Sequence, residues 1–578
     1  MNDTAHPESP KHPESESLSD ETLVEGHDEA SSIAGETVVQ LGAAGAPSAP
    51  STAALDKSTE RSAFLVGAGI LISRIIGLIR QRVFAHYFGL SDAADAFNAA
   101  FKIPNFLQNV FGEGALSASF IPVYARLLAH DDEKEASHVA SAVLTLLALA
   151  TSVIVLVGVL TTPYLIDLIA PGFEGAKREL TIRLVKIFFP GAGLLVLSAW
   201  CLGVLNSHRK FFLSYTAPVI WNLAIIGALV SFGRRVDQFR LAEIVAWGSV
   251  AGSALQFAVQ LPTVLRLVKQ LRPVFDVATA EVRSVVHNFF PVFFSRGVVQ
   301  ISAFVDAWLA SWLGTGAVGA LSYTQSIYTL PVSLFGMAVS AAELPAMAGA
   351  RGTTTEVAAA IRQRLDAGLQ RIAFFIVPSA MAFLALGDVM AGALYRTGEF
   401  NEDAATYVWG ILAGSSVGLL ASTLGRLYSS SYYALRDTRT PLLFAIIHVS
   451  LATVLGYLCA LPLPRYLGIE PKWGVVGLTL SASVAAWIEL LLLRRTLNHR
   501  IGRTGLTFSY LLKLSIAALL AANIGWALKL ILPNLHPIPL AAVVLGAYGV
   551  SYFGVTFILD ISESRAVLGK VFRRKLVG

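Results

Sequence analysis

The sequence predicts an all-α, polytopic membrane protein, and three observations carry this prediction. Hydrophobic residues make up 54% of the 578 residues, only 14% are charged, and the mean hydropathy is +0.62. A soluble protein of this length would carry about 25% charged residues. From residue 62 onward, apolar runs of about 20 residues recur, each long enough to cross a hydrocarbon core. The two cysteines, Cys201 and Cys459, lie in such runs, which argues against a disulfide framework and against a cysteine-based metal site.

Residues 1–60 differ from everything that follows. They contain twelve Asp or Glu against two Lys and no aromatic residue, so they cannot bury enough apolar surface to fold. They also lack the basic start and apolar core of a signal peptide. We expect a disordered, acidic cytosolic tail, either a plain solvated chain or a docking segment. The remaining residues carry 42 basic against 27 acidic side chains, a balance that suits the cytoplasmic edge of an anionic bilayer.

Hydropathy places about 14 transmembrane helices after the tail. We group the first six spans in an N-terminal lobe, 61–270, and the next six in a C-terminal lobe, 271–500. The last two spans and a basic cytosolic C-terminus occupy 501–578. The predicted spans lie near residues 62–84, 93–127, 138–162, 180–205, 213–233, 241–267, 284–312, 317–346, 371–395, 404–433, 440–463, 473–493, 509–533 and 538–559.

The loop charges predict the orientation of these spans. Loops after even-numbered spans are rich in arginine and lysine, as at Arg266 and Lys269, whereas the loops after the seventh and thirteenth spans carry none. A basic loop at 234–240 runs against the trend. The positive-inside rule places both termini in the cytoplasm.

Two parts of the chain repeat the same features in the same order. A Ser-Arg pair ends at Arg74 in the first span and at Arg296 in the seventh. An aromatic residue, a glycine and a proline follow each pair, and then VFGEGALSASFIP (110–122) matches LFGMAVSAAELP (334–345). Because both spans are odd-numbered, the repeat keeps its orientation, as in parallel-repeat transporters. Prolines inside the spans fit a transporter that bends, since such breaks are tolerated where neighbours or a cavity satisfy the backbone.

Arg74 and Arg296 are the strongest candidates for a binding site. An arginine at the centre of a membrane helix costs about 2.5–3.5 kcal/mol, and two at equivalent positions indicate one anion site between the lobes. The planar guanidinium matches phosphate oxygens. The alternative is an ion pair with Asp306 or Glu343 that only holds the lobes together.

Five further charges accompany these arginines. Arg80 and its neighbour Arg82 lie near the end of the first span, where snorkelling to the interface also explains them. Asp95 begins the second span, either as a helix N-terminal charge or as the partner of Arg80. Lys102 and Glu113 bracket a proline break and either pair with each other or line a cavity.

Motifs for other chemistry do not occur in the sequence. No GxxxxGK[ST] loop, no His/Glu metal spacing and no nucleophile elbow is present, so we expect neither an enzyme nor a cofactor. An ion gradient, the membrane potential or the substrate's own gradient must then supply energy, and one charge crossing 100 mV gains about 2.3 kcal/mol. Asp388 and Glu489 are single acids within spans, either buried and neutral or sites for a coupling ion of unknown identity.

The segment SRIIGLIRQRVFAHYFG (73–89), with DAADAFNAAFKIPNFLQNVFGEGALSASFIPVYA (92–125), resembles the N-terminal signature of the MurJ (MviN) lipid II flippases. These belong to the multidrug/oligosaccharidyl-lipid/polysaccharide (MOP) exporter superfamily. Weaker matches lie at 215–222, 330–339 and 433–441. The resemblance covers roughly residues 62–560. It implies 14 helices, two lobes in a V, a central cationic cavity, and export of an undecaprenyl-pyrophosphate-linked peptidoglycan precursor to the outer leaflet.

The resemblance also assigns individual positions. Arg74 and Arg80 match arginines that the family uses in its cavity, Asp95 matches its helix 2 acid, and Glu113 matches its glutamate after the helix 2 break. Ser326 stands where the family offers another cavity arginine. We expect Arg296, on the adjacent span, to supply the missing charge.

Together these observations predict a flippase in the bacterial cytoplasmic membrane that moves lipid II by alternating access. Expected partners are lipid II, membrane lipids and, through the tail, cell-wall synthesis proteins, but not nucleic acid. The alternatives are an exporter of another polyprenyl-pyrophosphate-linked oligosaccharide, an ion-coupled exporter of small molecules, and a scaffold for wall-synthesis enzymes. The predicted substrate-binding residues are Arg74, Arg80, Arg296, Asp95, Glu113 and Lys102.

Overall fold

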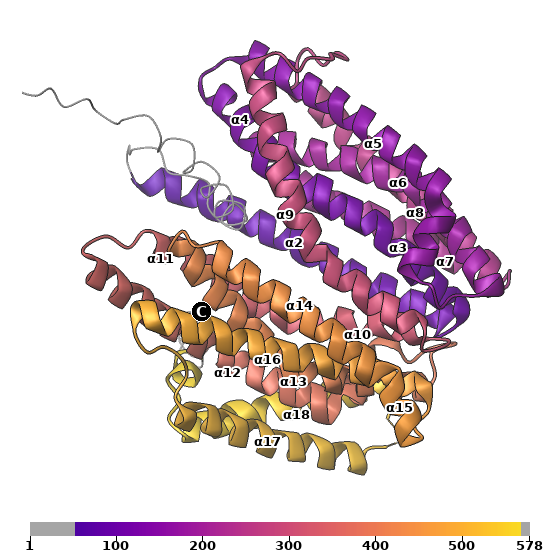
Figure 1. Cartoon of the computed structure of the whole chain (residues 1–578), viewed down its shortest axis with the longest axis vertical. Helices are drawn as coiled ribbons and strands as arrows, with labels where there is room; N and C mark the ends of the chain where they lie inside the picture. The colour runs from indigo at the N-terminus through magenta and orange to yellow at the C-terminus, as the bar shows by residue number, and fades with distance from the viewer. Residues whose placement is uncertain (1–51, 534, 568–578) are drawn as a thin grey trace, which may run out of the picture.

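The computed structural model describes residues 52–533 and 535–567, without the side chains at 52–68, 70, 104, 112–113 and 294–303. The predicted acidic tail therefore lies outside the described residues, except for 52–60, which begin the first helix. The described chain is built of helices (Figure 1), and its one extended pairing is an isolated bridge between Thr397 and Phe400. The all-α class is confirmed.

The described helices follow one another with short connections. They are α2 (Thr52–Phe88), α3 (Asp92–Leu107), η1 (Gln108–Leu116), α4 (Ser117–Ala129), α5 (Glu133–Ile169), α6 (Gly175–Ser207), α7 (Phe211–Phe232), α8 (Gln238–Leu267), α9 (Ala280–Ser311), α10 (Ala317–Pro331), η2 (Val332–Met337), α11 (Ala338–Ala348), α12 (Thr354–Tyr395), α13 (Glu402–Ala434), α14 (Arg439–Ala460), α15 (Pro462–Leu467), η3 (Pro471–Trp473), α16 (Gly474–Ile501), α17 (Phe508–Ile531) and α18 (Pro537–Ile558).

Eleven helical segments in the described part are long and apolar enough to cross a membrane. Three further long segments, α2, the run α3–η1–α4, and α9, occupy the remaining predicted spans. Many large apolar side chains stay exposed; on α14, for example, Leu442, Ile446 and Val454 are each about half accessible. A helix face of this kind requires lipid or protein to cover it. The polytopic membrane architecture is confirmed, and the number of 14 spans stays a prediction.

The two repeated segments share a local irregularity. Both η1 and η2 are stretches of π-helix, and η2 directly follows Pro331. Proline lacks the N–H that the helical ladder needs, and π-turns widen the helix, often at functional positions. The sequence repeat thus coincides with the same backbone distortion at both places.

The helices form two bundles that lie side by side (Figure 1). In the first lobe, α2 packs on α7, and α3, α5, α7 and α8 pack around or beside α6. In the second lobe, α13 and α16 are the central pair, surrounded by α10, α11, α12 and α14. The last two helices, α17 and α18, pack on each other and on α12.

The connection between the lobes is held to the first lobe. Residues 268–279 run along α5, where the amides of Arg272 and Val274 donate to Ser141 and Thr145. Asp276 in this loop accepts hydrogen bonds from Thr279 and from His138 Nε2, the latter at 2.8 Å. These bonds hold the pKa of Asp276 below its usual range. Beyond this loop, α9 packs on η1, α4 and α5 of the first lobe and on α10, α14 and α16 of the second.

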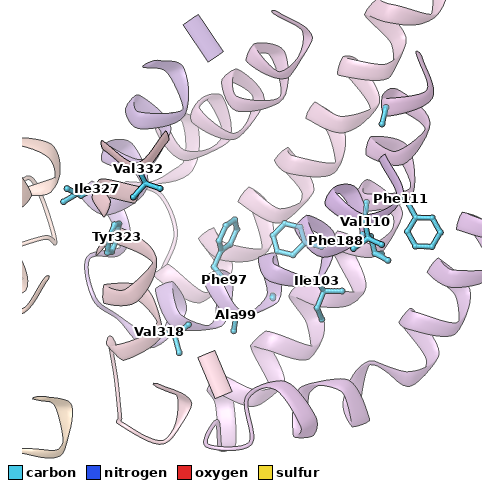
Figure 2. Packing of buried hydrophobic residues seen from close by; sticks show 14 of the residues in the cluster. Phe97, Ala99, Ile103, Val110, Phe111, Phe188, Val318, Tyr323, Ile327 and Val332 are labelled. Carbon is cyan, nitrogen blue, oxygen red and sulfur yellow. The ribbon is translucent and has the colours of Figure 1, made fainter. Parts of the chain in front are cut away.

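Aromatic packing stiffens the first lobe where α3 meets its neighbours. Figure 2 shows Phe97 of α3 beside Phe188 of α6, with ring centroids 5.2 Å apart and an edge-on orientation. One turn further along α3, Phe101 contacts Phe188 and stacks on Trp221 of α7 with centroids 5.6 Å apart. Edge-on and stacked rings add about 0.5–1.5 kcal/mol each beyond their buried area.

Tyrosines of α18 repair the backbone of α12. Pro378 lies inside α12 and has no N–H to donate to the carbonyl of Phe374, four residues earlier. Tyr552 Oη donates to that carbonyl at 2.6 Å, and Tyr548 Oη donates to the carbonyl of Pro378 at 2.6 Å. A carbonyl without its helical partner must find another donor in a membrane helix. The tyrosines of α18 supply that donor, so the packing of α18 on α12 compensates for the proline.

Candidate functional site

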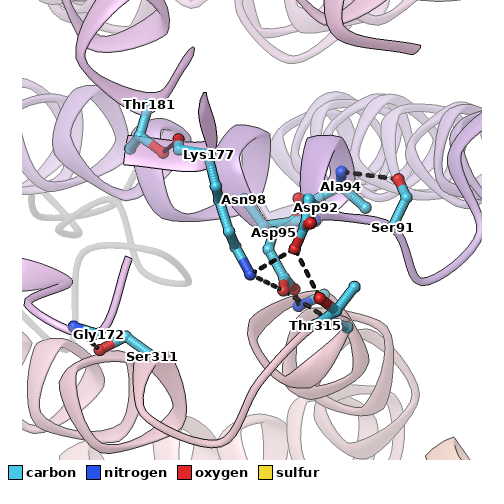
Figure 3. Close-up of polar contacts among 12 residues, drawn as sticks. Ser91, Asp92, Ala94, Asp95, Asn98, Gly172, Lys177, Thr181, Ser311 and Thr315 are labelled. Carbon is cyan, nitrogen blue, oxygen red and sulfur yellow. Dashed lines mark hydrogen bonds and ion pairs between the residues drawn. The ribbon is translucent and has the colours of Figure 1, made fainter. Parts of the chain in front are cut away.

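Asp95 joins the two lobes at one end of the molecule. The side chain is fully buried at the start of α3, and its Oδ2 lies 2.6 Å from Lys177 Nζ of α6 (Figure 3). The same carboxylate accepts the amides of Gly316 and Gly319, both at 2.7 Å, at the N-terminus of α10. An anion is favoured there because the first amides of a helix lack partners and carry its positive dipole end. Of the two expectations for Asp95, the pair with Arg80 is wrong, because Lys177 takes that place.

Asp92 and the glycine at position 316 complete this contact. Asp92 Oδ1 accepts Thr315 Oγ1 at 2.8 Å and lies 3.0 Å from Lys177 Nζ. Gly316 has a φ of 85°, and a Cβ there would come within 2.9 Å of the Leu90 carbonyl oxygen. The close approach of α10 to the α2–α3 turn therefore requires glycine.

Arg82 makes the complementary contact at the end of another helix. Its Nη1 donates to the carbonyls of Ala393 and Leu394 at 2.6 and 2.9 Å, in the last turn of α12. Nearby, His86 Nδ1 lies 2.8 Å from Thr397 Oγ1. The last carbonyls of a helix lack partners and carry its negative dipole end, so a cation is favoured there. Snorkelling does not account for Arg82.

We call two sets of contacts the clasp. The first joins Asp92 and Asp95 to Lys177 and to the start of α10, and the second joins Arg82 to the end of α12. In both halves of the clasp, a charged side chain of the first lobe bonds to a helix end of the second lobe. The anion Asp95 accepts the free amides at the N-terminus of α10, and the cation Arg82 donates to the free carbonyls at the C-terminus of α12. Sequence reasoning missed Lys177 and the role of Arg82. The acceptors of Arg82 are main-chain carbonyls 311 and 312 residues away, and no sequence pattern marks them.

Arg80 rests on aromatic rings instead of an acid. Its guanidinium carbon lies 5.2 Å from the ring centroid of Trp221 and 5.7 Å from that of Phe101. Rings in this position attract a cation by about 0.5–2 kcal/mol. Among the side chains that the structure describes, no carboxylate forms a salt bridge with Arg80. The positive charge is thus held in place without being neutralised.

Arg74 reaches across to the second lobe. The side chain is exposed, and Nη1 donates to Ser333 Oγ of η2 at 3.3 Å. The expected alternative, in which Arg74 pairs with Glu343, is wrong. Glu343 instead lies 3.1 Å from Arg371 and 3.6 Å from Arg364, both of α12. Arg74 therefore keeps its charge free of any acid in the described part of the chain.

Lys102 lies within electrostatic reach of an acid on α9. Lys102 of α3 and Asp306 of α9 attract each other electrostatically, and Asp306 also interacts with His448 of α14. Both side chains are partly exposed. This places Lys102 beside an acid of α9 that sequence reasoning had considered only as a partner for the arginines.

Two predicted site residues lie outside the described side chains. The backbone of α9 contains Arg296 and that of η1 contains Glu113, but neither side chain belongs to the described set. Their roles stay predictions. Ser326, at the place of the missing family arginine, donates to the carbonyl of Ser322 at 3.0 Å inside α10.

The described residues contain no group of three His, Cys, Asp or Glu that could hold a metal ion. The charged groups between the lobes are instead two arginines without acidic partners, a clasp at one end, and the Lys102–Asp306 contact. The two arginines thus leave positive charge available to an anion.

The sequence of this chain is similar to that of known proteins. Residues 84–545 match the protein family described as lipid II flippase MurJ. The lipid II flippase MurJ of Burkholderia cenocepacia is 31% identical over 448 residues, which cover 76% of this chain and 84% of that protein.

Solved structures show the same fold. A structure of "Lipid II flippase MurJ, inward closed conformation" superposes with a TM-score of 0.70 at 24% identity and covers 89% of this chain and 100% of that one. An inward-facing MATE family transporter of the MOP superfamily has a TM-score of 0.59 at 16% identity, covering 74% of this chain and 95% of that one. The two-lobed arrangement is thus shared with membrane transporters.

Proposed function

The chain belongs to the lipid II flippase MurJ family, and from this premise we propose that it moves lipid II from the inner to the outer leaflet of the cytoplasmic membrane by alternating access. The observation that carries the proposal is the pair Arg74 and Arg80. Both are on α2, Arg74 contacts Ser333 of the second lobe, Arg80 lies over rings of the first lobe, and both keep their charge without an acidic partner in the described part. A pyrophosphate group supplies the missing negative charge, and guanidinium groups bind phosphate oxygens through paired, charge-assisted hydrogen bonds.

The surroundings of these arginines suit a lipid-linked anion. Leu71, Ile75 and Ile79 of α2 are exposed beside Arg74, so an apolar surface lies next to the charge. The pyrophosphate would bind the arginines while the polyprenyl chain stays in the bilayer. Burial of the charged group away from water makes each such contact stronger than at a surface.

The clasp provides the gate that alternating access requires. With both termini in the cytoplasm, the α2–α3 turn faces outward, and the clasp at this turn closes the protein toward the outer leaflet. Release to that leaflet then requires Asp95 and Arg82 to leave the helix ends of the second lobe. A substrate can drive this change only by binding the open state more tightly than the closed one.

The test uses the full-length protein in proteoliposomes that contain lipid II, with an impermeant reagent to measure the lipid II exposed in each leaflet. We expect Arg74→Gln and Arg80→Gln each to slow translocation about 10–100-fold, since a hydrogen bond to a charged group contributes about 1.5–3 kcal/mol. The matched control is Arg178→Gln, because Arg178 is a partly exposed arginine already paired with Asp167 at 2.7 Å. Absence of translocation by the unaltered protein, or an unchanged rate in the double variant, would contradict the proposal.

The same liposomes separate the other candidate functions. A polyprenyl pyrophosphate with a different glycan, moved faster than lipid II, would identify an exporter of another oligosaccharide. For a scaffold acting through the acidic tail, deletion of residues 2–60 should stop growth of a flippase-depleted strain that depends on this chain. For a flippase, the deletion should leave translocation and growth largely intact, and any loss would assign wall-synthesis partners to the tail.

A further inference from the structure

Ten arginines of the second lobe gather at one end of it, where α11, α13 and α16 finish and where α12, α14 and α17 begin. We call residues 349–371, 434–441 and 494–507 the basic end. They contain ten arginines and no lysine, against three Asp or Glu, and all ten arginine side chains are exposed. So many exposed charges of one sign form a surface that attracts a polyanion.

Contacts between the three stretches make them one surface. The amide of Gly505, between α16 and α17, donates to Asp366 Oδ1 of α12 at 2.9 Å. Arg500 of α16 lies 2.7 Å from Asp437, in the turn between α13 and α14. The helix α13 packs on both α12 and α16, so the arginines of the three stretches lie around the same helix ends.

Most of these arginines form no salt bridge. Glu343 of α11 pairs with Arg364 and Arg371 of α12. Six others have no salt bridge to any side chain that the structure describes: Arg351, Arg362, Arg436, Arg439, Arg495 and Arg503. The side chains outside the described set do not reverse this excess, because residues 52–68 contain two acids and two bases, and residues 568–578 contain four bases and no Asp or Glu.

The corresponding loops of the first lobe are nearly balanced in charge. Residues 126–138, 208–210 and 266–283 contain eight Lys or Arg against six Asp or Glu. The preference for basic loops on the inner side of a membrane acts on both lobes. It does not explain why the excess of positive charge gathers on the second lobe, so this excess indicates a binding partner.

The N-terminal tail joins the described chain at the same end of the molecule. At the clasp, Gly316 at the start of α10 closely approaches Leu90, just after α2. Further along both segments, Arg74 of α2 donates to Ser333 of η2. The two segments therefore run antiparallel, and the start of α2 at Thr52 points to the end where α11 finishes, opposite the clasp (Figure 1).

The sequence of the tail complements the charge of the basic end. Residues 8–36 contain nine Asp or Glu and one lysine, and carboxylates match the planar fork of arginine. Residues 37–51, which connect them to α2, contain no charged residue. A flexible linker of that length spans about 20 Å and gives an effective concentration in the millimolar range. The tail therefore has an advantage over any acidic protein that is free in solution.

The position of the arginines favours the tail over lipid headgroups as the partner. Arg362 of α12 precedes the apolar span that begins near residue 371 by about 13 Å along the helix. At the other side of the surface, α16 continues to Ile501, about 12 Å beyond the span that ends near residue 493. The headgroup layer is only about 5–8 Å thick on each side of a bilayer, so these arginines reach past it into water.

We propose that the basic end of the second lobe is a docking surface for residues 8–36 of the same chain. The carboxylates of the tail pair with the arginines that form no salt bridge with the described side chains. Because α2 belongs to the first lobe and the basic end to the second, the docked tail connects the two lobes at the end opposite the clasp. The contact is electrostatic, so salt weakens it, and it does not depend on translocation.

The test measures the distance from the tail to the basic end in the full-length protein, in nanodiscs of phosphatidylcholine. The two native cysteines are replaced by serine, and spin labels are attached to cysteines that replace Ser19 and the exposed Gln363 of α12. At about 0.01 M salt we expect a short, narrow distance distribution. At about 1 M salt, where the Debye length falls from about 30 Å to about 3 Å, the distribution should become long and broad. A label on the exposed Ala129 of α4, in place of Gln363, should give a broad distribution at both salt concentrations.

Two kinds of variant decide whether charge pairing is responsible. Replacement of the nine acids of residues 8–36 by Gln or Asn leaves the membrane part of the chain unchanged and should release the tail at low salt.

The second variant combines Arg439→Gln, Arg495→Gln and Arg503→Gln. It should lower the ratio of docked to free tail about 3–100-fold at intermediate salt, since each exposed pair contributes about 1.5–5-fold. The matched control removes three exposed positive charges from the first lobe through Lys134→Gln, Lys210→Gln and Arg266→Gln, and it should keep the tail docked.

Three results would overturn the docking surface. The first is a distance between positions 19 and 363 that does not respond to salt in the unaltered tail. The second is equal release of the tail by the first-lobe and second-lobe triple variants. The third is release of the tail in nanodiscs that contain phosphatidylglycerol, which would assign the basic end to anionic lipid headgroups.

Discussion

The helices α2 and α3 carry charges in two very different settings. At the end near the α2–α3 turn, Asp95 and Arg82 are neutralised by helix ends of the second lobe, with contacts of 2.6–2.9 Å. Further from this turn, Arg74 donates to a hydroxyl at 3.3 Å, Arg80 lies over aromatic rings, and neither has an acidic partner among the described side chains. Under the proposed function, the difference separates two tasks: charges matched by the protein hold the lobes together, and charges without such a partner bind the substrate.

The largest expected effect comes from the anionic half of the clasp. In Asp95→Ala, Lys177 is left buried without its closest partner, and two amides of α10 lose their acceptor. Breaking a buried pair in this way costs about 3–5 kcal/mol. Spin labels on cysteines that replace the exposed Tyr164 of α5 and Tyr466 of α15, with the two native cysteines changed to serine, report the separation of the lobes, and their distance should shift to the open value. The control is Asp167→Ala, which removes a salt bridge at a side chain 57% exposed and should change the equilibrium by less than about 1 kcal/mol. A closed distance in Asp95→Ala would refute the role of the clasp.

The cationic half of the clasp should matter less. Arg82→Ala removes two charge-assisted hydrogen bonds to α12, a loss of about 1.5–3 kcal/mol. The same spin labels should show a partial shift toward the open state. Because the two halves hold different helices, the double variant with Asp95→Ala should add the two effects within about 0.5 kcal/mol. Strong non-additivity would mean that one half depends on the other.

Loss of the aromatic support of Arg80 should affect binding but not closure. In Trp221→Leu, the guanidinium loses the nearer of its two rings, and a cation–π contact contributes about 0.5–2 kcal/mol. We expect the affinity for a polyprenyl pyrophosphate, measured by calorimetry, to fall about 2–30-fold, with the spin-label distance unchanged. Trp247→Leu changes an exposed tryptophan of α8 and is the control. An opened clasp in Trp221→Leu would remove the distinction between the two regions.

The smallest effect should come from the contact of Arg74 with the second lobe. Ser333→Ala removes one long, partly exposed hydrogen bond, and such changes stay within about 0.5 kcal/mol. Closure and lipid affinity should both remain close to those of the unaltered protein. If this variant opened the lobes as far as Arg82→Ala does, Arg74 would be a structural contact and not a binding group.

Much of the architecture follows from local patterns. The sequence shows the apolar runs, the acidic first 60 residues and the paired Ser-Arg positions. The apolar runs predict the helical membrane class. The Ser-Arg pairs predict the internal repeat, and the structure has a π-helical segment in each copy of it, η1 and η2. For Asp95, the position at a helix start was recognisable, but the wrong helix was considered. Its carboxylate caps α10 through amides 221 and 224 residues away, and main-chain donors have no sequence signature.

The sequence by itself determined that this protein spans a membrane, that it carries arginines where lipid does not tolerate them, and which family it resembles. The preference of apolar side chains for burial and the free-energy cost of an unpaired charge in lipid both depend on residue type. The sequence alone therefore predicts both. Only the tertiary structure decided which charges are matched and which remain open. Packing of distant helices brings Lys177 to Asp95 and brings the ends of α10 and α12 to Asp95 and Arg82, and the partners of a charge are set by that packing.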